Sequence, residues 1–366
     1  MVKGRFKTSF NGFAMQQTLL SAFVALSIST AISAQELKVL DLGGNLFSID
    51  AKTAELQFIG SAGLLPHFWN AMAMDSQGKM YGAYGRYFAP YAIYEIDPNT
   101  GQATFVVQTS FIGIRGMAFG PGDVLYLTNE RDAPLIASPV DLHTLDLSTG
   151  ATSLIGELDA ARVQCLDFFN GELFGNDSDR GLIKIDTNTA LSTDVNPNSS
   201  EPPTLTVSFC FSDSGALFYV DSSLWMIDPQ QGTYSLVEPA LFLPLWAEAE
   251  FIEGPKDPFA LWVGGETDGP MSVHLSGAGP NASVAVAWER GGGVGGPTII
   301  PNGFPCAGTP VNLNSGMKLL TVLQADPNGS ASTSPQFVPA GARRTVHMQA
   351  IDLSTCETSN RILISY

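Results

Sequence analysis

Positive charge and cysteine are both scarce in this chain, and each shortage excludes a class of protein. Its 366 residues include 18 Lys and Arg against 35 Asp and Glu, and the basic residues form no patch. So acidic a protein repels phosphate backbones and anionic lipid surfaces, which argues against nucleic-acid binding. The four cysteines include no Cys-x-x-Cys pair, and this favours disulfides over a zinc site or a redox centre.

Short catalytic motifs are missing as well. The sequence has no Gly-x-Ser-x-Gly turn, no His-Glu-x-x-His helix and no phosphate-binding loop. The histidines are too scattered in the sequence to suggest a metal cluster, and they are His67, His143, His274 and His347. We therefore expect no cofactor, and each histidine is expected to be a turn or surface residue.

Long apolar runs are absent outside the first 34 residues. That segment has three basic residues, an apolar stretch from Leu19 to Ile28, and small residues ending at Ala34, which is the layout of a cleaved secretory signal peptide. The apolar stretch is shorter than the roughly 20 residues that span a bilayer. Removing residues 1–34 takes away three basic residues and no acidic ones, so the net charge becomes −20. We expect a secreted or cell-surface protein, extracellular or periplasmic, without a membrane span.

A pattern of apolar strand, Asp, short polar turn and second apolar strand occurs five times. Two of the turns read Asp97-Pro98-Asn99-Thr100-Gly101 and Asp146-Leu147-Ser148-Thr149-Gly150, in which Asp bonds the backbone two residues on and Gly accepts a positive φ. The five turns are spaced by 47, 49, 40 and 42 residues, a period typical of propeller blades. They begin at Asp50, Asp97, Asp146, Asp186 and Asp228.

A second two-strand unit precedes each of the last four Asp turns, and large and small residues alternate in it. These units span 70–83, 116–128, 163–176 and 207–220. A fifth such pair, 247–251 and 261–263, has no Asp turn after it, whereas the first Asp turn, within Leu46 to Ile59, has no such pair before it. We therefore predict an all-β fold: a five-bladed β-propeller over residues 35–266, with one blade closed by N- and C-terminal strands.

The character of the sequence changes after Gly265, where Gly and Pro become dense and the Asp turns stop. Short alternating strands are expected at 272–275, 283–288, 319–325 and 346–351, which suggests a small immunoglobulin-like β-sandwich over residues 267–366. Cys306 and Cys356 both lie in it, and we predict a disulfide between them. Cys165 and Cys210 occupy equivalent strands of successive repeats, where a bridge between blades and two buried thiols fit almost equally well.

Two resemblances add to this interpretation. By pattern, the repeats resemble the quinoprotein-like and YVTN-like β-propeller superfamily. Several short runs of the last quarter of the chain resemble a C-terminal module of secreted proteins from planctomycete-type bacteria, which implies a bacterial, extracellular protein. These runs are Leu275-Ser276-Gly277-Ala278, Ile300-Pro301, Pro305-Cys306-Ala307-Gly308-Thr309, Asp326-Pro327-Asn328-Gly329, Val338-Pro339-Ala340-Gly341 and Gln349-Ala350-Ile351-Asp352.

Candidate ligand-binding residues come from similar segments that lead into inner strands, Leu65 to Asn70 and Leu243 to Glu248. Trp69 and Trp246 take matching positions in them, and both indoles would lie near one mouth of the propeller channel. Stacking faces and polar groups together suit a carbohydrate or small ligand. The alternative is that both indoles are packing caps over the blade cores. The residues proposed for the mouth are Trp69, Asn70, Arg115, Gln164, Trp246 and Glu248.

Three carboxylates on inner strands supply an enzymatic alternative, since glycosidases use such pairs as acid and as base or nucleophile. They are Asp167, Glu248 and Glu250. Asp177 and Asp179 begin a calcium-loop pattern, but the later bidentate Glu is missing, so a plain turn is the better interpretation.

The favoured function is an exported, non-enzymatic scaffold that binds a small molecule, a glycan or a protein partner. Its rivals are a glycosidase-like propeller hydrolase and a purely structural surface protein.

Overall fold

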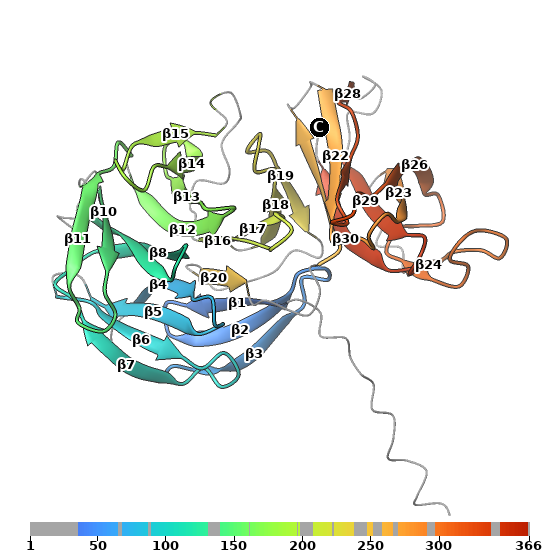
Figure 1. Ribbon diagram of the computed structural model, residues 1–366. Coiled ribbons are helices and arrows are strands. Elements are labelled where there is room, and N and C mark those ends of the chain that lie inside the picture. Colours follow the sequence, from blue (N-terminus) through green and yellow to red (C-terminus); the bar gives the residue numbers. More distant parts are fainter. Residues whose placement is uncertain are drawn as a thin grey trace, which may run out of the picture. The chain divides into compact units, whose positions relative to one another are not determined.

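The computed structural model (Figure 1) contains strands and no helix in the part of the chain that it describes. The chain divides into Met1–Ser33 and Ala34–Tyr366, and the first unit, with the predicted signal peptide, lies outside the described residues. Backbone alone is described for 247–251 and 336–337. The description covers 36–364 except 65–67, 87–88, 131–139, 161, 196, 198–207, 222, 238–246, 252–257, 266–269, 291–296 and 338–344.

Five sets of four antiparallel strands follow one another along the chain, and four of them are contiguous in sequence. The first comprises β4 (Phe68–Met74), β5 (Met80–Gly85), β6 (Ala92–Ile96) and β7 (Ala103–Gln108). The second comprises β8 (Ile114–Gly120), β9 (Val124–Glu130), β10 (Val140–Leu145) and β11 (Thr152–Glu157). The third comprises β12 (Val163–Phe169), β13 (Glu172–Asp177), β14 (Gly181–Ile185) and β15 (Ser192–Asp194). The fourth comprises β16 (Ser208–Phe211), β17 (Leu217–Val220), β18 (Leu224–Ile227) and β19 (Tyr234–Val237).

The remaining set joins the two ends of this region. Strand β20 (Ala247–Phe251) pairs with β1 (Glu36–Asp41), and β2 (Asn45–Asp50) and β3 (Leu56–Ser61) follow. Closure by strands from both ends is as predicted, but its composition is not. Strand β21 (Ala260–Gly265), expected as the second strand of this set, pairs with β22 instead, and β1 takes its place beside β20. The C-terminal sheets therefore begin before residue 267.

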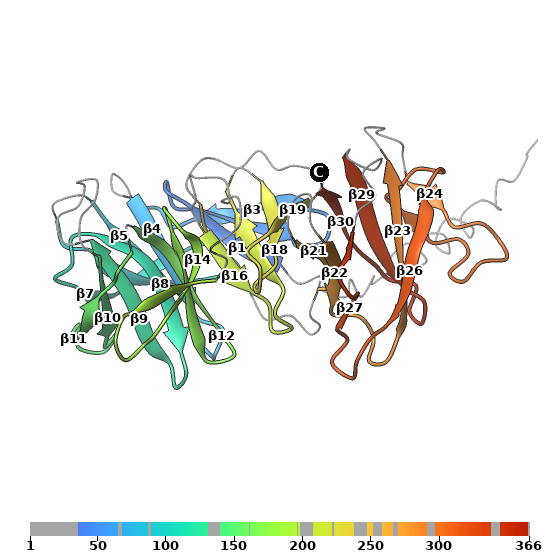
Figure 2. The ribbon, with the colours of Figure 1, turned by 90° about the horizontal axis from the view of Figure 1, so that it is seen from above.

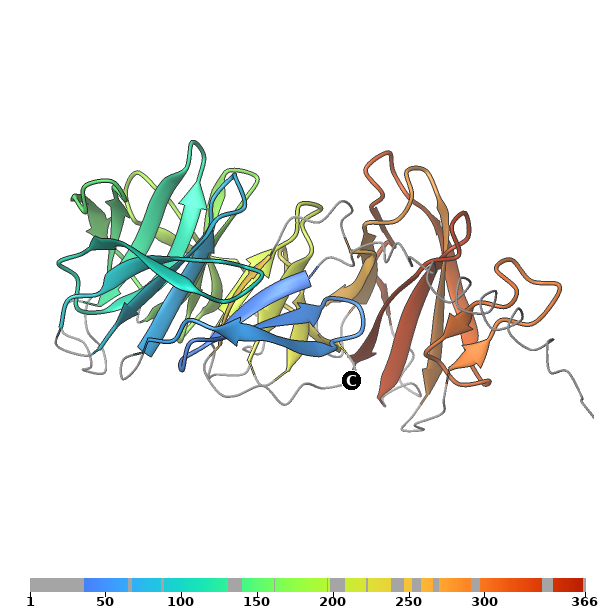
Figure 3. The same cartoon turned by 90° about the horizontal axis from the view of Figure 1, so that it is seen from below.

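The first strands of the five sets contact one another in a closed ring: β4 with β8, β8 with β12, β12 with β16, β16 with β20, and β20 with β4. A separate apolar core lies between each pair of neighbouring sets. The core beside the N-terminal strands combines Leu37 and Val39 of β1 with Phe218 and Met226. Figure 3 shows these N-terminal strands in blue beside the yellow strands of the fourth set.

The Asp turns join the third and fourth strands as their local chemistry requires. In the turn at Asp97, the Asn99 N–H donates to the carboxylate at 2.8 Å, and the Gly101 N–H donates to the Asp97 carbonyl at 2.8 Å. Gly101 has φ +74°, and Ala190 takes the same place in the turn at Asp186 with φ +61°. A glycine is thus favoured but not obligatory at this position.

The C-terminal strands form two larger sheets and one two-stranded sheet. One of the larger sheets continues the fourth set of the ring. Strand β19 pairs with β30, with Leu236 opposite Leu363, and the order then runs β30, β29, β23, β26 (Figure 2). The other sheet contains β21, β22, β27 and β28, and β24 pairs with β25. The bounds are β22 (Pro270–Ser276), β23 (Ser283–Arg290), β24 (Thr298–Ile299), β25 (Pro310–Val311), β26 (Lys318–Gln324), β27 (Ala331–Ser332), β28 (Gln336–Phe337), β29 (Val346–Asp352) and β30 (Thr358–Ile364).

The disulfide between Cys306 and Cys356 is confirmed, with a Cα–Cα distance of 5.3 Å. Cys165 and Cys210 are buried and take part in no disulfide. Cys356 closes a sixth Asp turn, between β29 and β30, in which the Cys356 N–H donates to the Asp352 carbonyl at 2.8 Å. The expectation that Asp turns stop after Gly265 was therefore wrong, because cysteine at φ +62° stands where the other turns have Gly or Ala.

Candidate functional site

The predicted mouth residues Asn70, Arg115 and Gln164 lie at equivalent places in three successive first strands. Each falls at a register shift between the first and second strands of its set, within β4, β8 and β12. A β-bulge re-aims the side chains beside it and is common next to active sites. The first strands also approach closely here, because a Cβ on Gly116 would lie 3.0 Å from the Cys165 carbonyl carbon.

Arg115 and Arg162 both form ion pairs with one buried carboxylate, that of Glu130, and the pair with Arg162 connects two sets. The Arg115 Nε lies 3.1 Å from Oε2 of Glu130, at the end of β9, and the Arg162 Nε lies 3.1 Å from Oε1 of the same carboxylate. The Glu130 side chain is 3% exposed, whereas Arg162, just before β12, is 32% exposed. A carboxylate so deeply buried needs charged partners to offset its lost hydration. The Glu130 carboxylate therefore holds the guanidinium groups of Arg115 and Arg162 in fixed positions.

The other two polar residues at the bulges differ in how they are held. The Asn70 amide donates to the Tyr91 hydroxyl at 2.5 Å, and Tyr91 is 1% exposed. Gln164 is half-buried, and within the part of the chain that the structure describes its side chain makes no hydrogen bond. Asn70 is therefore fixed by the fold, whereas the Gln164 amide keeps its hydrogen-bonding capacity for another group.

The predicted stacking surface of Trp69 is not exposed. Its indole is 0% exposed within an apolar core that also contains Leu40, Leu46 and Met80, and the ring lies 5.1 Å from that of Tyr84. This is the packing alternative that the sequence left open. Trp246 lies outside the described residues. For Glu248 and Glu250 only the backbone of β20 is described, opposite Leu40 and Lys38 of β1.

Asp167 bridges two first strands. Its half-buried carboxylate accepts hydrogen bonds from the Phe211 N–H of β16 at 2.6 Å and from the Phe168 N–H at 2.7 Å. Burial raises the pKa of Asp167 to about 7, although both hydrogen bonds act in the opposite direction. A carboxyl group with this pKa exchanges a proton near neutral pH, as a general acid must.

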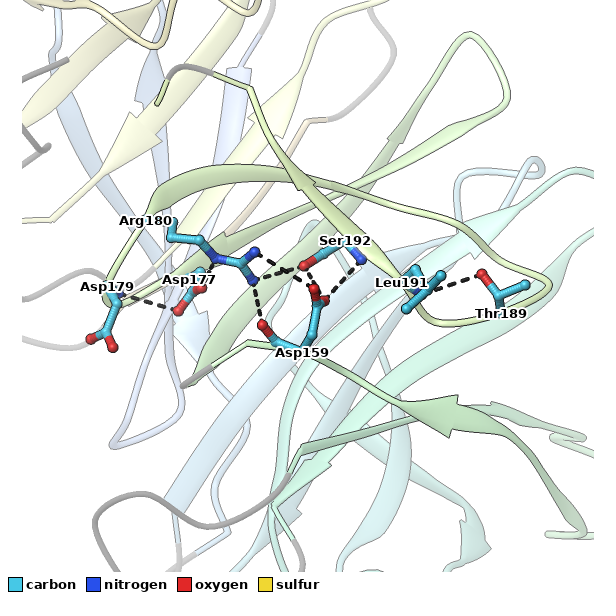
Figure 4. A network of polar contacts seen from close by, with 7 residues as sticks. All are labelled: Asp159, Asp177, Asp179, Arg180, Thr189, Leu191 and Ser192. Atoms are coloured by element: carbon cyan, nitrogen blue, oxygen red, sulfur yellow. Dashed lines mark hydrogen bonds and ion pairs between the residues drawn. The ribbon is translucent and has the colours of Figure 1, made fainter. Parts of the chain in front are cut away.

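Arg180 fills the place that a cation would take in the Asp177–Asp179 turn. Its Nε lies 2.6 Å from Oδ2 of Asp177, and Nη2 donates to the Ser192 hydroxyl at 2.7 Å and to the Asp159 carbonyl at 2.8 Å (Figure 4). The Ser192 hydroxyl donates in turn to the Asp159 carboxylate, which is the main reason that the pKa of Asp159 is lowered. Among the described residues, no group of His, Cys, Asp and Glu is arranged to hold a metal.

The sequence alone did not predict a role for Glu130 or Arg162, although a repeat pattern could have indicated Glu130. The second strands β1, β9 and β13 end at acidic residues, and Asp221 directly follows β17. Their partners differ from set to set: Asp41 accepts from Asn45, and Asp221 accepts from the Trp225 indole. The partner Arg162 could not be found from the repeat alone, because it lies just before β12 and so belongs to the neighbouring set.

A further titratable pair connects the fourth set with the C-terminal sheets. The Asp228 carboxylate, at the turn before β19, lies 3.3 Å from Nε2 of His274 on β22, and the Ser272 hydroxyl lies 2.7 Å from the same nitrogen. Burial lowers the pKa of His274, and Asp228 opposes that shift. Because Ser272 and Asp228 meet one imidazole nitrogen, His274 does not bridge them as the histidine of a catalytic triad does.

No protein-family model and no curated protein matches the chain. Among solved structures, a PQQ-bound aldose sugar dehydrogenase from Streptomyces coelicolor is 13% identical over 66% of this chain and 84% of its own, with a TM-score of 0.35. A calcium-binding protein, regucalcin from Agrobacterium tumefaciens, is 15% identical over 59% and 76%, with a TM-score of 0.36. A protein of unknown function from Bacteroides caccae is 12% identical over 81% and 92%, with a TM-score of 0.37.

The repeats resemble quinoprotein-like and YVTN-like β-propellers by pattern, and these neighbours, all with TM-scores below 0.5, carry no argument about the superfamily. They include one enzyme and one calcium-binding protein, and we base no argument about activity on a likeness of this size. The resemblance of the last quarter of the chain to a planctomycete-type module stays a prediction.

Proposed function

We propose that this chain is an exported, non-enzymatic scaffold that binds a small molecule or a glycan at one end of a five-bladed β-propeller. The five sets of strands are its blades, and one blade is closed by β20 and β1. The five separate cores between neighbouring sets support that count. The two C-terminal sheets form a small sandwich of immunoglobulin-like type, for which we propose a role in attachment.

The observation that carries the binding proposal is the triple bulge at Asn70, Arg115 and Gln164. Three neighbouring first strands have equivalent bulges, each at a polar residue, and we place the mouth of the channel at these bulges. Arg162 adds a guanidinium that Glu130 holds by Nε and that is one third exposed. Amide and guanidinium donors beside a channel suit the hydroxyl or carboxylate oxygens of a sugar or small acid.

Export is supported by two observations. The Cys306–Cys356 disulfide suggests an oxidising compartment, and residues 1–34 have the layout of a signal peptide. In the part of the chain that the structure describes, no helix is both long and apolar enough to cross a bilayer.

A glycan and metabolite screen tests the binding proposal, with the Gln164→Ala and Arg162→Gln variants beside the wild-type chain. We expect a hit whose affinity falls about tenfold in either variant, because each removes roughly one charged or polar contact worth about 1.4 kcal/mol. The matched control is Lys184→Gln, which removes a half-exposed positive charge at the far end of β14. Equal affinity in all four proteins would contradict the proposed site.

A propeller hydrolase is the second candidate, favoured by the pKa of Asp167 near 7 on a first strand. Asp167 would act as the acid, with Glu248 or Glu250 as its partner carboxylate. The same screen separates the two functions, because a hydrolase converts its ligand and loses turnover, but not ligand affinity, in Asp167→Asn. A screen without any hit would favour a purely structural surface protein.

A further inference from the structure

Among the described residues, exposed large apolar side chains are most concentrated on one strand of the C-terminal sheets, β26, whereas those of the ring are spread over several sets. Five of the eleven exposed large apolar residues fall between 299 and 322, and three of them are on β26: Leu319 (62% exposed), Leu320 (44%) and Val322 (51%). Such a concentration on one strand marks an interaction surface more often than scattered exposed residues do.

Strand β26 is also an open edge. It is the last strand in the order of its eight-stranded sheet, and among the described residues it pairs with β23 alone. The next strand in sequence, β27, pairs with β22 of the other sheet, so no strand between 36 and 364 that the structure describes pairs with this edge. An apolar edge strand without Pro or acidic residues is a template for a further strand.

The charge distribution indicates what that further strand belongs to. No Asp or Glu occurs from 290 to 325, in a chain with nearly twice as many acidic as basic residues. Two copies of so acidic a protein repel each other over most of their surfaces, and β26 lies in a long stretch free of negative charge. The strand is also complementary to itself, because its single charge, Lys318, falls opposite Gln324 when two copies run antiparallel about Thr321.

We propose that two copies of this chain associate through β26, which extends the sheet from one copy into the other. The pairing is antiparallel and two-fold symmetric, so that Leu320 of each copy faces Val322 of its partner. The same kind of contact already occurs within the chain, where β30 adds to the outer edge of β19. This association is independent of the proposed binding function, because β26 belongs to none of the five sets that form the ring.

Light scattering on the purified full chain tests the proposal through a charge exchange. One variant carries Leu320→Lys with Val322→Lys, and a second carries Leu320→Glu with Val322→Glu. In the proposed register each variant places like charges opposite each other, so both are expected to be monomers at concentrations where the wild-type chain has twice the monomer mass. Mixing the two variants places opposite charges face to face, and we expect the dimer to return.

The control is Leu154→Lys, which adds charge to an exposed apolar position on β11 of the ring and should leave the dimer intact. Unchanged melting temperatures in all variants would show that the fold is preserved. A wild-type chain that stays monomeric at every concentration measured would overturn the proposal. So would a dimer that persists in both double variants, or one that fails to return on mixing.

Discussion

The Trp69 indole occupies the space in which Gly82 would carry a side chain. A Cβ on Gly82 would lie 2.7 Å from Cζ3 of Trp69, and a Cβ on Gly44 would lie 2.5 Å from its Nε1. Two glycines, one in the turn between β1 and β2 and one on β5, therefore make room for one fully buried ring. That relationship assigns Trp69 to the core between two sets of the ring rather than to a ligand surface.

Replacing Trp69 by Ala should consequently lower stability by about 3–5 kcal/mol, the usual cost of removing a large buried aromatic side chain. Gly82→Ala should also destabilise the protein, since the new methyl group collides with the ring. Urea unfolding measures both effects. The matched control is Phe105→Ala, which removes an exposed ring and should change stability by less than about 1 kcal/mol. A Trp69→Ala variant with wild-type stability would contradict this assignment.

Much of the fold could be predicted because local chemistry repeats with it. Each of the five Asp turns contains its own acceptor, and three of them have Gly at the positive-φ position, so the turns could be recognised without knowledge of the tertiary structure. Aligning the repeats predicted that Arg115 and Gln164 take places equivalent to the segment of Asn70, whereas the bulges there are seen only in the structure. The turn at Asp352 was missed because Cys356 stands where a glycine was expected.

What the sequence could not predict depends on contacts between sets. Burial of Trp69 depends on Gly44, in the turn between β1 and β2, and on Gly82 of β5. The partner of β20 could not be chosen from pattern alone, because β1 and β21 are both short apolar strands. Only the pairing of β21 with β22 decides between them.

Closure of the ring predicts that the N-terminal strands cannot be removed. A chain beginning at Ser61 lacks β1, β2 and nearly all of β3, so β20 loses its partner strand and the core around Leu37 and Phe218 is opened. We expect a lower Tm and aggregation through the exposed sheet edges. Thermal unfolding and light scattering measure both. If the chain beginning at Ser61 has the same Tm and the same oligomeric state as the chain beginning at Gln35, the closure by β20 and β1 is wrong.

The disulfide predicts a selective effect of reduction on the C-terminal sheets. Cys306 and Cys356 are 50 residues apart, and in the chain-entropy model a loop of this length stabilises the fold by roughly 4 kcal/mol. Replacing both cysteines by Ala should therefore lower the urea midpoint, and a reducing agent should then have no further effect. Replacing Cys165 and Cys210 by Ala is the control, and there a reducing agent should still destabilise the protein. An equal response to reduction in both variants would contradict the assignment.

The raised pKa of Asp167 predicts a loss of stability as the pH rises. In the unfolded chain this carboxyl ionises near 3.8, but in the folded protein it holds its proton up to about pH 7. The folded state thus binds more protons over that range, so the contribution of Asp167 is fully present below about pH 4 and is lost as the pH rises through about 7. Asn cannot ionise. Its single side-chain oxygen replaces only one of the two carboxylate oxygens that accept from the Phe211 and Phe168 N–H groups, and the loss of the other hydrogen bond adds a destabilisation that does not depend on pH.

Asp167→Asn should therefore become more stable relative to wild type between about pH 5 and about pH 8, by on the order of 2–4 kcal/mol. Urea unfolding at the two pH values gives the difference directly. Asp186→Asn is the matched control: the Asn188 backbone N–H lowers the pKa of Asp186, so this exposed turn carboxylate is ionised in both states throughout the range. If the free energy of unfolding changes with pH in the same way for wild type and Asp167→Asn, Asp167 is ionised in the folded protein at neutral pH. That result would contradict the role of Asp167 as a general acid.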